Sequence, residues 1–127
     1  MAYTAGLFYV PGLTAAANYA AHQYKACQVL STGCTLIATS VLTASVVGLL
    51  QNDPASGEEA NLAVAGIAKG IAGTSTIVRG SPLGTDTTGR LVVTTADNAF
   101  VVGKSLAAPT AVNDIFEVLL IPGGWRY

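Results

Sequence analysis

Hydrophobic and polar residues alternate along most of the chain in short runs separated by turn residues, a pattern typical of β-strands. The clearest case runs from Tyr24 to Leu30, reverses at Ser31-Thr32-Gly33 and continues from Cys34 to Ala38. This pattern predicts a β-hairpin with Thr32-Gly33 as its loop. Further strands are predicted at 46–50, 61–72, 77–78, 90–95, 100–106 and 115–121.

Turn residues punctuate these runs at intervals of about ten residues. Asp86-Thr87-Thr88-Gly89 has the composition of a tight turn. The segment 61–72 is rich in alanine, but Gly66, Gly70 and Gly73 disfavour a helix there, so we expect a strand with a glycine kink. The sequence therefore predicts an all-β fold, either a compact β-barrel or a β-sandwich of short antiparallel strands.

Two parts of the chain are similar to each other. Val46-Val47-Gly48 is followed by a proline-containing loop and the segment 58–64. Val101-Val102-Gly103 is likewise followed by Pro109 and the segment 113–119. We interpret these stretches as two related strand-loop-strand units.

The first 24 residues have no Asp, Glu, Lys or Arg, yet they hold five of the nine aromatic residues of the chain. Those five are Tyr3, Phe8, Tyr9, Tyr19 and Tyr24. One interpretation is an extended N-terminal arm, residues 1–24, that packs on another surface beside a β-rich core domain of residues 25–127. The other is a first strand and loop of the same core.

Charge is scarce and scattered. The net charge is -1, and the six Lys and Arg residues stand singly, so they form no stripe that could neutralise phosphates or bind an anionic membrane. We therefore expect no direct nucleic-acid partner and no membrane partner. Charged residues make up 10% of the chain, against about 25% in soluble domains. So little charge leads us to expect that partners cover much of the surface.

The most apolar stretch is 36–50, the one candidate for a membrane span. Its 15 residues fall short of the roughly 18 that a spanning helix needs, and four of them are Ser or Thr. We interpret it as a pair of buried strands. The N-terminus lacks the basic start of an export signal, so we expect the protein to be made and folded in a cytoplasm.

The two cysteines are expected to be reduced. With Thr32-Gly33 as the loop, Cys27 lies opposite Ala38 and Cys34 lies opposite Ser31, too far apart along the ladder for a disulfide. Two cysteines and one histidine also cannot supply the four ligands of a structural zinc site. We expect no metal.

No catalytic set is evident. His22 is the single histidine, and the chain has no G-x-S-x-G motif around a nucleophilic serine. Gly103-Lys104-Ser105 matches the end of a phosphate-binding loop, but Asn98 stands where its first glycine should be. We expect no cofactor and no catalytic residue, which favours a structural or assembly protein over an enzyme.

The run Gln51-Asn52-Asp53-Pro54-Ala55-Ser56-Gly57-Glu58 resembles a motif of the small capsid decoration (cement) proteins of tailed double-stranded DNA phages. Shorter matches cover nearly all of the chain after residue 24. They are Ser31-Thr32-Gly33, Lys69, Gly89-Arg90, Val101 to Gly103 and Val118 to Gly123. The resemblance implies an all-β homotrimer on the outer surface of the virion capsid, at three-fold or quasi-three-fold positions, that bridges neighbouring major capsid protein subunits.

On this hypothesis the aromatic residues near the two ends of the chain make the contacts. Tyr3, Phe8, Tyr9 and Tyr19 anchor on the capsid protein. Trp125 and Tyr127 pack at an intersubunit or capsid edge. The alternative is a phage surface binding module, such as a fibre or adhesin base, that recognises a host glycan or protein through a pocket in the loops 51–59 and 80–89.

Overall fold

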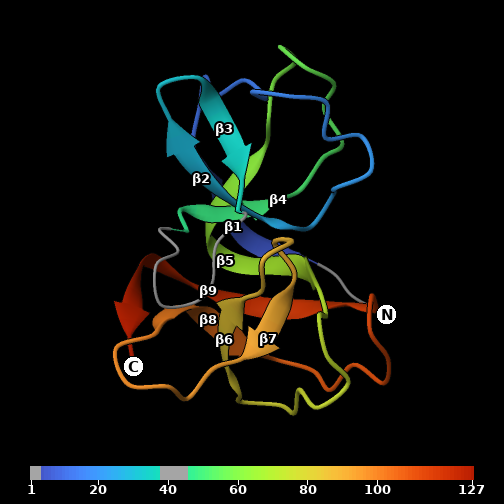
Figure 1. The fold of residues 1–127 in the computed structure, drawn as a ribbon, viewed down its shortest axis with the longest axis vertical. Helices are drawn as coiled ribbons and strands as arrows, with labels where there is room; N and C mark the ends of the chain where they lie inside the picture. Colours follow the sequence, from blue (N-terminus) through green and yellow to red (C-terminus); the bar gives the residue numbers. More distant parts are fainter. Residues whose placement is uncertain (1–3, 38–45) are drawn as a thin grey trace.

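A computed structural model describes residues 4–37 and 46–127 of the chain (Figure 1). The fold is all-β, as the sequence predicts, and its strands form one large, curled antiparallel sheet that resembles half of a barrel. The strands are β1 (Ala5–Tyr9), β2 (Ala26–Leu30), β3 (Gly33–Leu36), β4 (Gly48–Leu50), β5 (Leu62–Ile71), β6 (Pro82–Thr85), β7 (Leu91–Val93), β8 (Phe100–Ser105) and β9 (Ile115–Arg126).

Within the described part of the chain, no helix is long and apolar enough to cross a membrane. The segment 36–50 ends with β4, whose three residues are fully buried. Its middle part, 38–45, lies outside the described residues.

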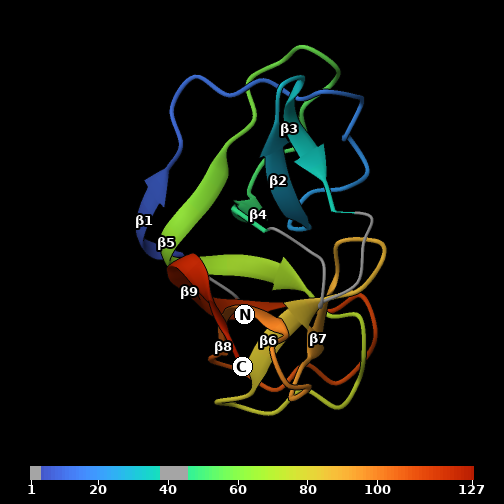
Figure 2. The ribbon, with the colours of Figure 1, turned by 60° about the vertical axis from the view of Figure 1, so that its left-hand side comes forward.

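Strand β5 joins the two halves of the molecule. The strand order is β3-β2-β4-β5-β9-β8-β6-β7, with β1 paired to β5 off this path. The start of β5 pairs with β4, and its end pairs with β9. Figure 2 shows β5 changing direction between the half that holds β2 and β3 and the half that holds β6 to β9. A separate hydrophobic cluster fills the half around β2 and β3, and a larger one fills the rest of the fold.

The change of direction in β5 depends on a glycine. Gly66 has a φ of +93°, a conformation that side chains disfavour, and a Cβ at this position would collide with the carbonyl oxygen of Gly6 in β1. The glycine kink predicted in segment 61–72 is therefore present. It lets the main chain of β1 approach β5 closely at Gly6.

The two similar segments form the same kind of unit. Each is an antiparallel pair of strands, β4 with β5 and β8 with β9. Each connecting loop also contains the same carboxylate-capped turn. In the first, the Ala55 N–H donates to the Glu58 carboxylate at 2.7 Å and the Glu58 N–H donates to the Ala55 carbonyl at 3.0 Å. Ala111 and Asp114 make the corresponding bonds, at 3.0 and 3.2 Å, in the second.

The β2–β3 hairpin has a different register from the one predicted. Its loop is Ser31-Thr32, so Leu30 pairs with Gly33 and Cys27 pairs with Leu36. The reason is that Gly33 serves a close approach and not the turn. A Cβ on Gly33 would collide with the carbonyl oxygen of Thr14, which accepts the Cys34 N–H at 2.8 Å.

The predicted strand at 77–78 is wrong. Val78 instead begins a turn in which its N–H donates to the Ser81 hydroxyl at 3.1 Å and its carbonyl accepts the Ser81 N–H at 3.0 Å. The strand of this region is β6, which starts at Pro82 and contains Gly84. Proline is tolerated at the first position of a strand, but both residues weaken the sequence signal.

The N-terminal segment is part of the fold from residue 4 onward. Strand β1 pairs with β5, and Ala15 and Tyr19 belong to the hydrophobic cluster around β2 and β3. Of the two interpretations offered for residues 1–24, the structure shows the first strand and loop of the core. Residue 24 is therefore not the end of a separate arm.

The side chain of Gln51 makes hydrogen bonds to the main chain of β5 like those that a neighbouring strand would make. Its amide donates to the Lys69 carbonyl at 3.0 Å and accepts the Lys69 N–H at 3.2 Å. Gln51→Leu removes both hydrogen bonds and leaves the Lys69 N–H and carbonyl without them. We expect it to lower the free energy of unfolding by about 2–3 kcal/mol in urea denaturation. Gln28→Leu in β2 is the matched control, because the Gln28 side chain has no hydrogen bond with any described residue. Equal stabilities of the two variants would contradict this role.

Candidate interaction surface

Strand β1 presents two neighbouring aromatic side chains to solvent. Phe8 is 69% exposed and Tyr9 46% exposed, whereas Leu7 packs against the core. Successive side chains of a regular strand point to opposite faces, so consecutive exposed residues need an explanation. The pairing of β1 with β5 is irregular on both sides of Phe8, and such bulges redirect side chains.

Strand β1 is also an edge with one main-chain partner. Among the described residues it pairs with β5 alone, and it lies at the margin of the molecule in Figure 2. The outer edge of β3 is covered, since Cys34 exchanges main-chain hydrogen bonds with Thr14 and Ala16. The edge of β7 is covered in part by the Gly73 N–H, which donates to Leu91. Natural edge strands are commonly protected by charged residues, and β1 has none.

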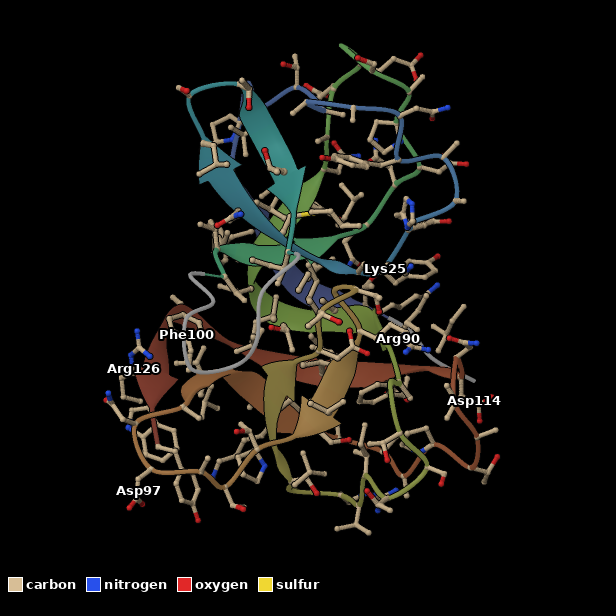
Figure 3. All side chains as sticks on the ribbon, viewed as in Figure 1. Lys25, Arg90, Asp97, Phe100, Asp114 and Arg126 are labelled. Carbon is tan, nitrogen blue, oxygen red and sulfur yellow. The ribbon has the colours of Figure 1, made fainter. Side chains whose placement is uncertain are left out.

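A second aromatic group lies at the end of β9. Trp125 and Tyr127 are 49% and 46% exposed, and their rings meet edge to face with centroids 6.0 Å apart. The Arg126 guanidinium lies over the Phe100 ring at 5.4 Å, and Figure 3 shows both residues at one end of the β8–β9 pair. The Tyr127 N–H donates to the Ala99 carbonyl at 2.9 Å. The sheet therefore holds this group in place.

The other two predicted contact residues are placed differently. Tyr19 is 7% exposed and packs inside the cluster around β2 and β3. Its hydroxyl oxygen accepts the Leu36 N–H at 3.2 Å, and its own N–H donates to the Pro54 carbonyl. Tyr19 is therefore occupied within the protein and is not available to a partner. Tyr3 lies outside the described residues.

The structure adds exposed apolar residues that the sequence analysis did not single out. They are Val29, Leu30, Val78, Val112, Ile115 and Leu119. The alternation of side chains along a strand could have identified two of them, Ile115 and Leu119. Both occupy odd-numbered positions of β9, whereas the even-numbered positions 116, 118 and 120 are buried. The outward face of β9 is thus apolar, and Glu117 interrupts it.

The charged residues Asp86 and Arg90 make contacts within the fold. Asp86 and Arg90 form an ion pair at 3.0 Å. The Asp86 carboxylate also accepts the Thr88 and Arg90 N–H groups, which closes the predicted 86–89 turn. Partial burial raises the pKa of Asp86, but hydrogen bonds from Thr88 and Arg90, with the charge of Arg90, bring this pKa below its ordinary value.

The lowered pKa of Asp86 predicts a pH dependence of stability. Since the folded-state pKa lies below the unfolded-state value of about 3.9, the contribution of Asp86 is present above pH 4 and is lost as the pH falls through the folded-state pKa. Asp86→Asn should lower the free energy of unfolding by about 1–2 kcal/mol at pH 7 and lessen its decline below pH 4. Denaturant titrations at pH 7 and pH 3 test this, and an unchanged pH profile in the variant would contradict it.

Among the described residues, no three His, Cys, Asp or Glu side chains could hold one metal ion. Gly103, Lys104 and Ser105 lie within β8, not in a loop that could wrap a phosphate. A shallow hollow of about 230 Å³ lies between the loop 107–110 and the start of β9, and neither 51–59 nor 80–89 contributes to it.

Comparisons with family models, curated proteins and solved structures found no match to this chain. Its function is therefore argued from the chain itself: the sequence motif, the sheet and the two exposed aromatic groups.

Proposed function

We propose that this protein is a structural virion protein, a capsid decoration (cement) protein of a tailed phage, and not an enzyme. It binds the outer surface of the phage head at three-fold or quasi-three-fold positions as a homotrimer. Its partners are the major capsid protein and further copies of itself. The resemblance that begins at Gln51 supports the family, and the all-β fold agrees with it.

One observation carries the proposal: β1 exposes the consecutive residues Phe8 and Tyr9 on a sheet edge that no other strand of the described residues covers. Large aromatic side chains dominate the binding energy of protein interfaces, and an edge strand that exposes them is a liability in an isolated protein. In a protein that functions while bound to a capsid, the capsid protein covers this edge. The low charge of the chain fits the same interpretation.

The motif that carries the resemblance helps to hold the fold together. The Asn52 side chain donates to the Glu59 carbonyl and accepts the Asn61 N–H, both at 2.9 Å. Glu58 caps its own turn and accepts the Ala15 N–H through its carbonyl. The loop 51–61 thus fixes the N-terminal segment against β4 and β5. Residues of the resembling run therefore have a structural role in this fold.

Stabilisation of a shell needs affinity and rigidity but no chemistry. A ligand that binds the assembled shell and not its free subunits stabilises the shell by RT ln(1 + [L]/Kd), or about 2.7 kcal/mol per site at a hundredfold excess over Kd. Many such sites add up over a head. The sheet, in which β4 is fully buried and four of the six residues of β8 are buried, supplies the rigid body that this role requires.

The alternative, a phage surface module that recognises a host glycan or protein, has less support. It calls for a polar, aromatic-lined pocket in the loops 51–59 or 80–89. In the structure the first loop is tied down by its own side chains, and the second is closed by Asp86 and Arg90. The hollow beside β9 has Phe116 as its single aromatic residue.

Heat stability of the shell tests the proposal. Expanded empty heads of the phage that encodes this protein are heated with and without saturating protein, and shell rupture is followed by light scattering and electron microscopy. We expect decorated heads to rupture at a higher temperature. A head that binds the protein without any gain in stability, or that fails to bind it, would contradict the proposal.

A further inference from the structure

The corrected hairpin register brings the two cysteines together. Cys27 in β2 pairs with Leu36, and Cys34 in β3 pairs with Val29, so the cysteines are diagonal neighbours two positions apart. Side chains two positions apart on a strand point to the same face. Both thiols are free, fully buried and part of one hydrophobic cluster.

The surroundings of the pair are mostly apolar side chains, and the Cys27 thiol also donates to the Lys25 carbonyl at 3.9 Å. Tyr19, Leu50 and Leu62 pack in the same cluster, which contains no charged residue. The thiols interact with each other: a hydrogen bond from Cys27 to Cys34, helped by burial, raises the pKa of Cys27. The same bond lowers the pKa of Cys34, although burial opposes this. Cys34 is therefore the thiol that ionises first, and the thiolate is the form that oxidants attack.

The pair has a route to solvent through local opening. Cys34 lies in β3, whose outer edge is covered by an irregular segment through the bonds of Cys34 with Thr14 and Ala16, at 2.8 and 3.0 Å. The same segment is also held by the Ala15 N–H, which donates to the Glu58 carbonyl at 2.9 Å. Exposure of the pair therefore requires this segment to detach from both β3 and the loop 51–61, which is a partial opening and not unfolding of the whole fold.

We propose that Cys27 and Cys34 form an oxidisable dithiol site, which a small peroxide converts into a disulfide that links β2 to β3. The Cys34 thiolate attacks one peroxide oxygen, the O–O bond breaks and hydroxide leaves, giving a sulfenic acid. The Cys27 sulfur then attacks the Cys34 sulfur, the S–O bond breaks and water leaves with the Cys27 proton. Two thiols lose two electrons, and hydrogen peroxide is reduced to two waters.

This site is independent of the proposed function, but it suits a protein that changes compartment. Thiols stay reduced in a cytoplasm, whereas disulfides persist outside the cell. A chain folded with two thiols would acquire its cross-link after release. The link closes the hairpin at the sheet end that is not held by β5.

The test uses the full chain treated with hydrogen peroxide under native conditions, then alkylated in denaturant and weighed intact. We expect a mass loss of about 2 Da, no alkylated cysteine, and recovery of two alkylation sites after reduction. The thermal midpoint should rise by about 5 °C on oxidation and return on reduction.

Cys27→Ala and Cys34→Ala are the matched controls, since neither can form the link. Each should show oxygen addition or no change, and no rise of the midpoint. Three results from the wild-type chain would each overturn the proposal. They are oxygen addition like that of the controls, a disulfide between two chains, and two alkylatable thiols after treatment just below the melting temperature.

Discussion

Replacing Phe8 and Tyr9 together by serine is expected to abolish binding to capsids while the fold stays intact. Both side chains are exposed in the free protein, so their truncation removes little packing inside it. An aromatic residue at the centre of an interface contributes about 2 kcal/mol or more, so losing two should weaken binding about a thousandfold. Sedimentation with expanded empty heads measures the binding, and circular dichroism checks the fold.

The control for this prediction is Val78→Ser, which removes another strongly exposed apolar side chain, in the 78–81 turn. We expect it to bind heads like the wild type. Full occupancy of the heads by the double variant would contradict the assigned role of β1. Deletion of residues 1–12 is a poorer experiment, because it removes β1 and uncovers β5, which mixes binding with folding.

Gly66→Ala is expected to cause the largest loss of stability among the substitutions considered. The new Cβ would face both a φ of +93° and a collision with the Gly6 carbonyl oxygen, and neither strand can move without breaking the β1–β5 pairing. We expect the free energy of unfolding to fall by about 3–5 kcal/mol in denaturant titrations.

Gly57→Ala separates the two causes. Gly57 also has a positive φ, of +82°, but a Cβ there would have open space around it. Its substitution should cost only the conformational strain, about 1 kcal/mol. If the two variants lose equal stability, the close approach of Gly6 in β1 is not the reason that Gly66 is needed.

The sequence predicts the parts of this fold that depend on local pattern. Alternating apolar residues mark β2, β8 and β9, and Asp86 with Gly89 marks a turn, because these signals lie within a few residues of each other. The kink in β5 is also visible, since Gly66 interrupts an otherwise regular strand. The two similar strand-loop-strand units follow from the repeated Val-Val-Gly pattern.

Features that depend on distant contacts are not predictable in this way. Gly33 has the appearance of a turn residue, but it is required by the carbonyl of Thr14, nineteen positions earlier, and this moved the hairpin register. In the observed register, Cys27 and Cys34 are neighbours, whereas the predicted register places them apart.

Distant contacts also decide which of the predicted contact residues are exposed. Phe8, Tyr9 and Tyr19 share one uncharged segment and are chemically alike, yet a bulge exposes the first two and Pro54 and Leu36 bind the third inside. Trp125, near the end of β9, and Tyr127, directly after it, are exposed together, and their rings contact each other. Nothing in the residue types alone distinguishes these cases.

The most direct test of the central claim is the mass of the purified protein in solution and of expanded empty heads before and after it is added. The account predicts a trimer in solution, or monomers that add to the head in sets of three, with a saturable gain in head mass. A protein that remains monomeric and leaves the mass of the heads unchanged at saturating concentration would contradict it.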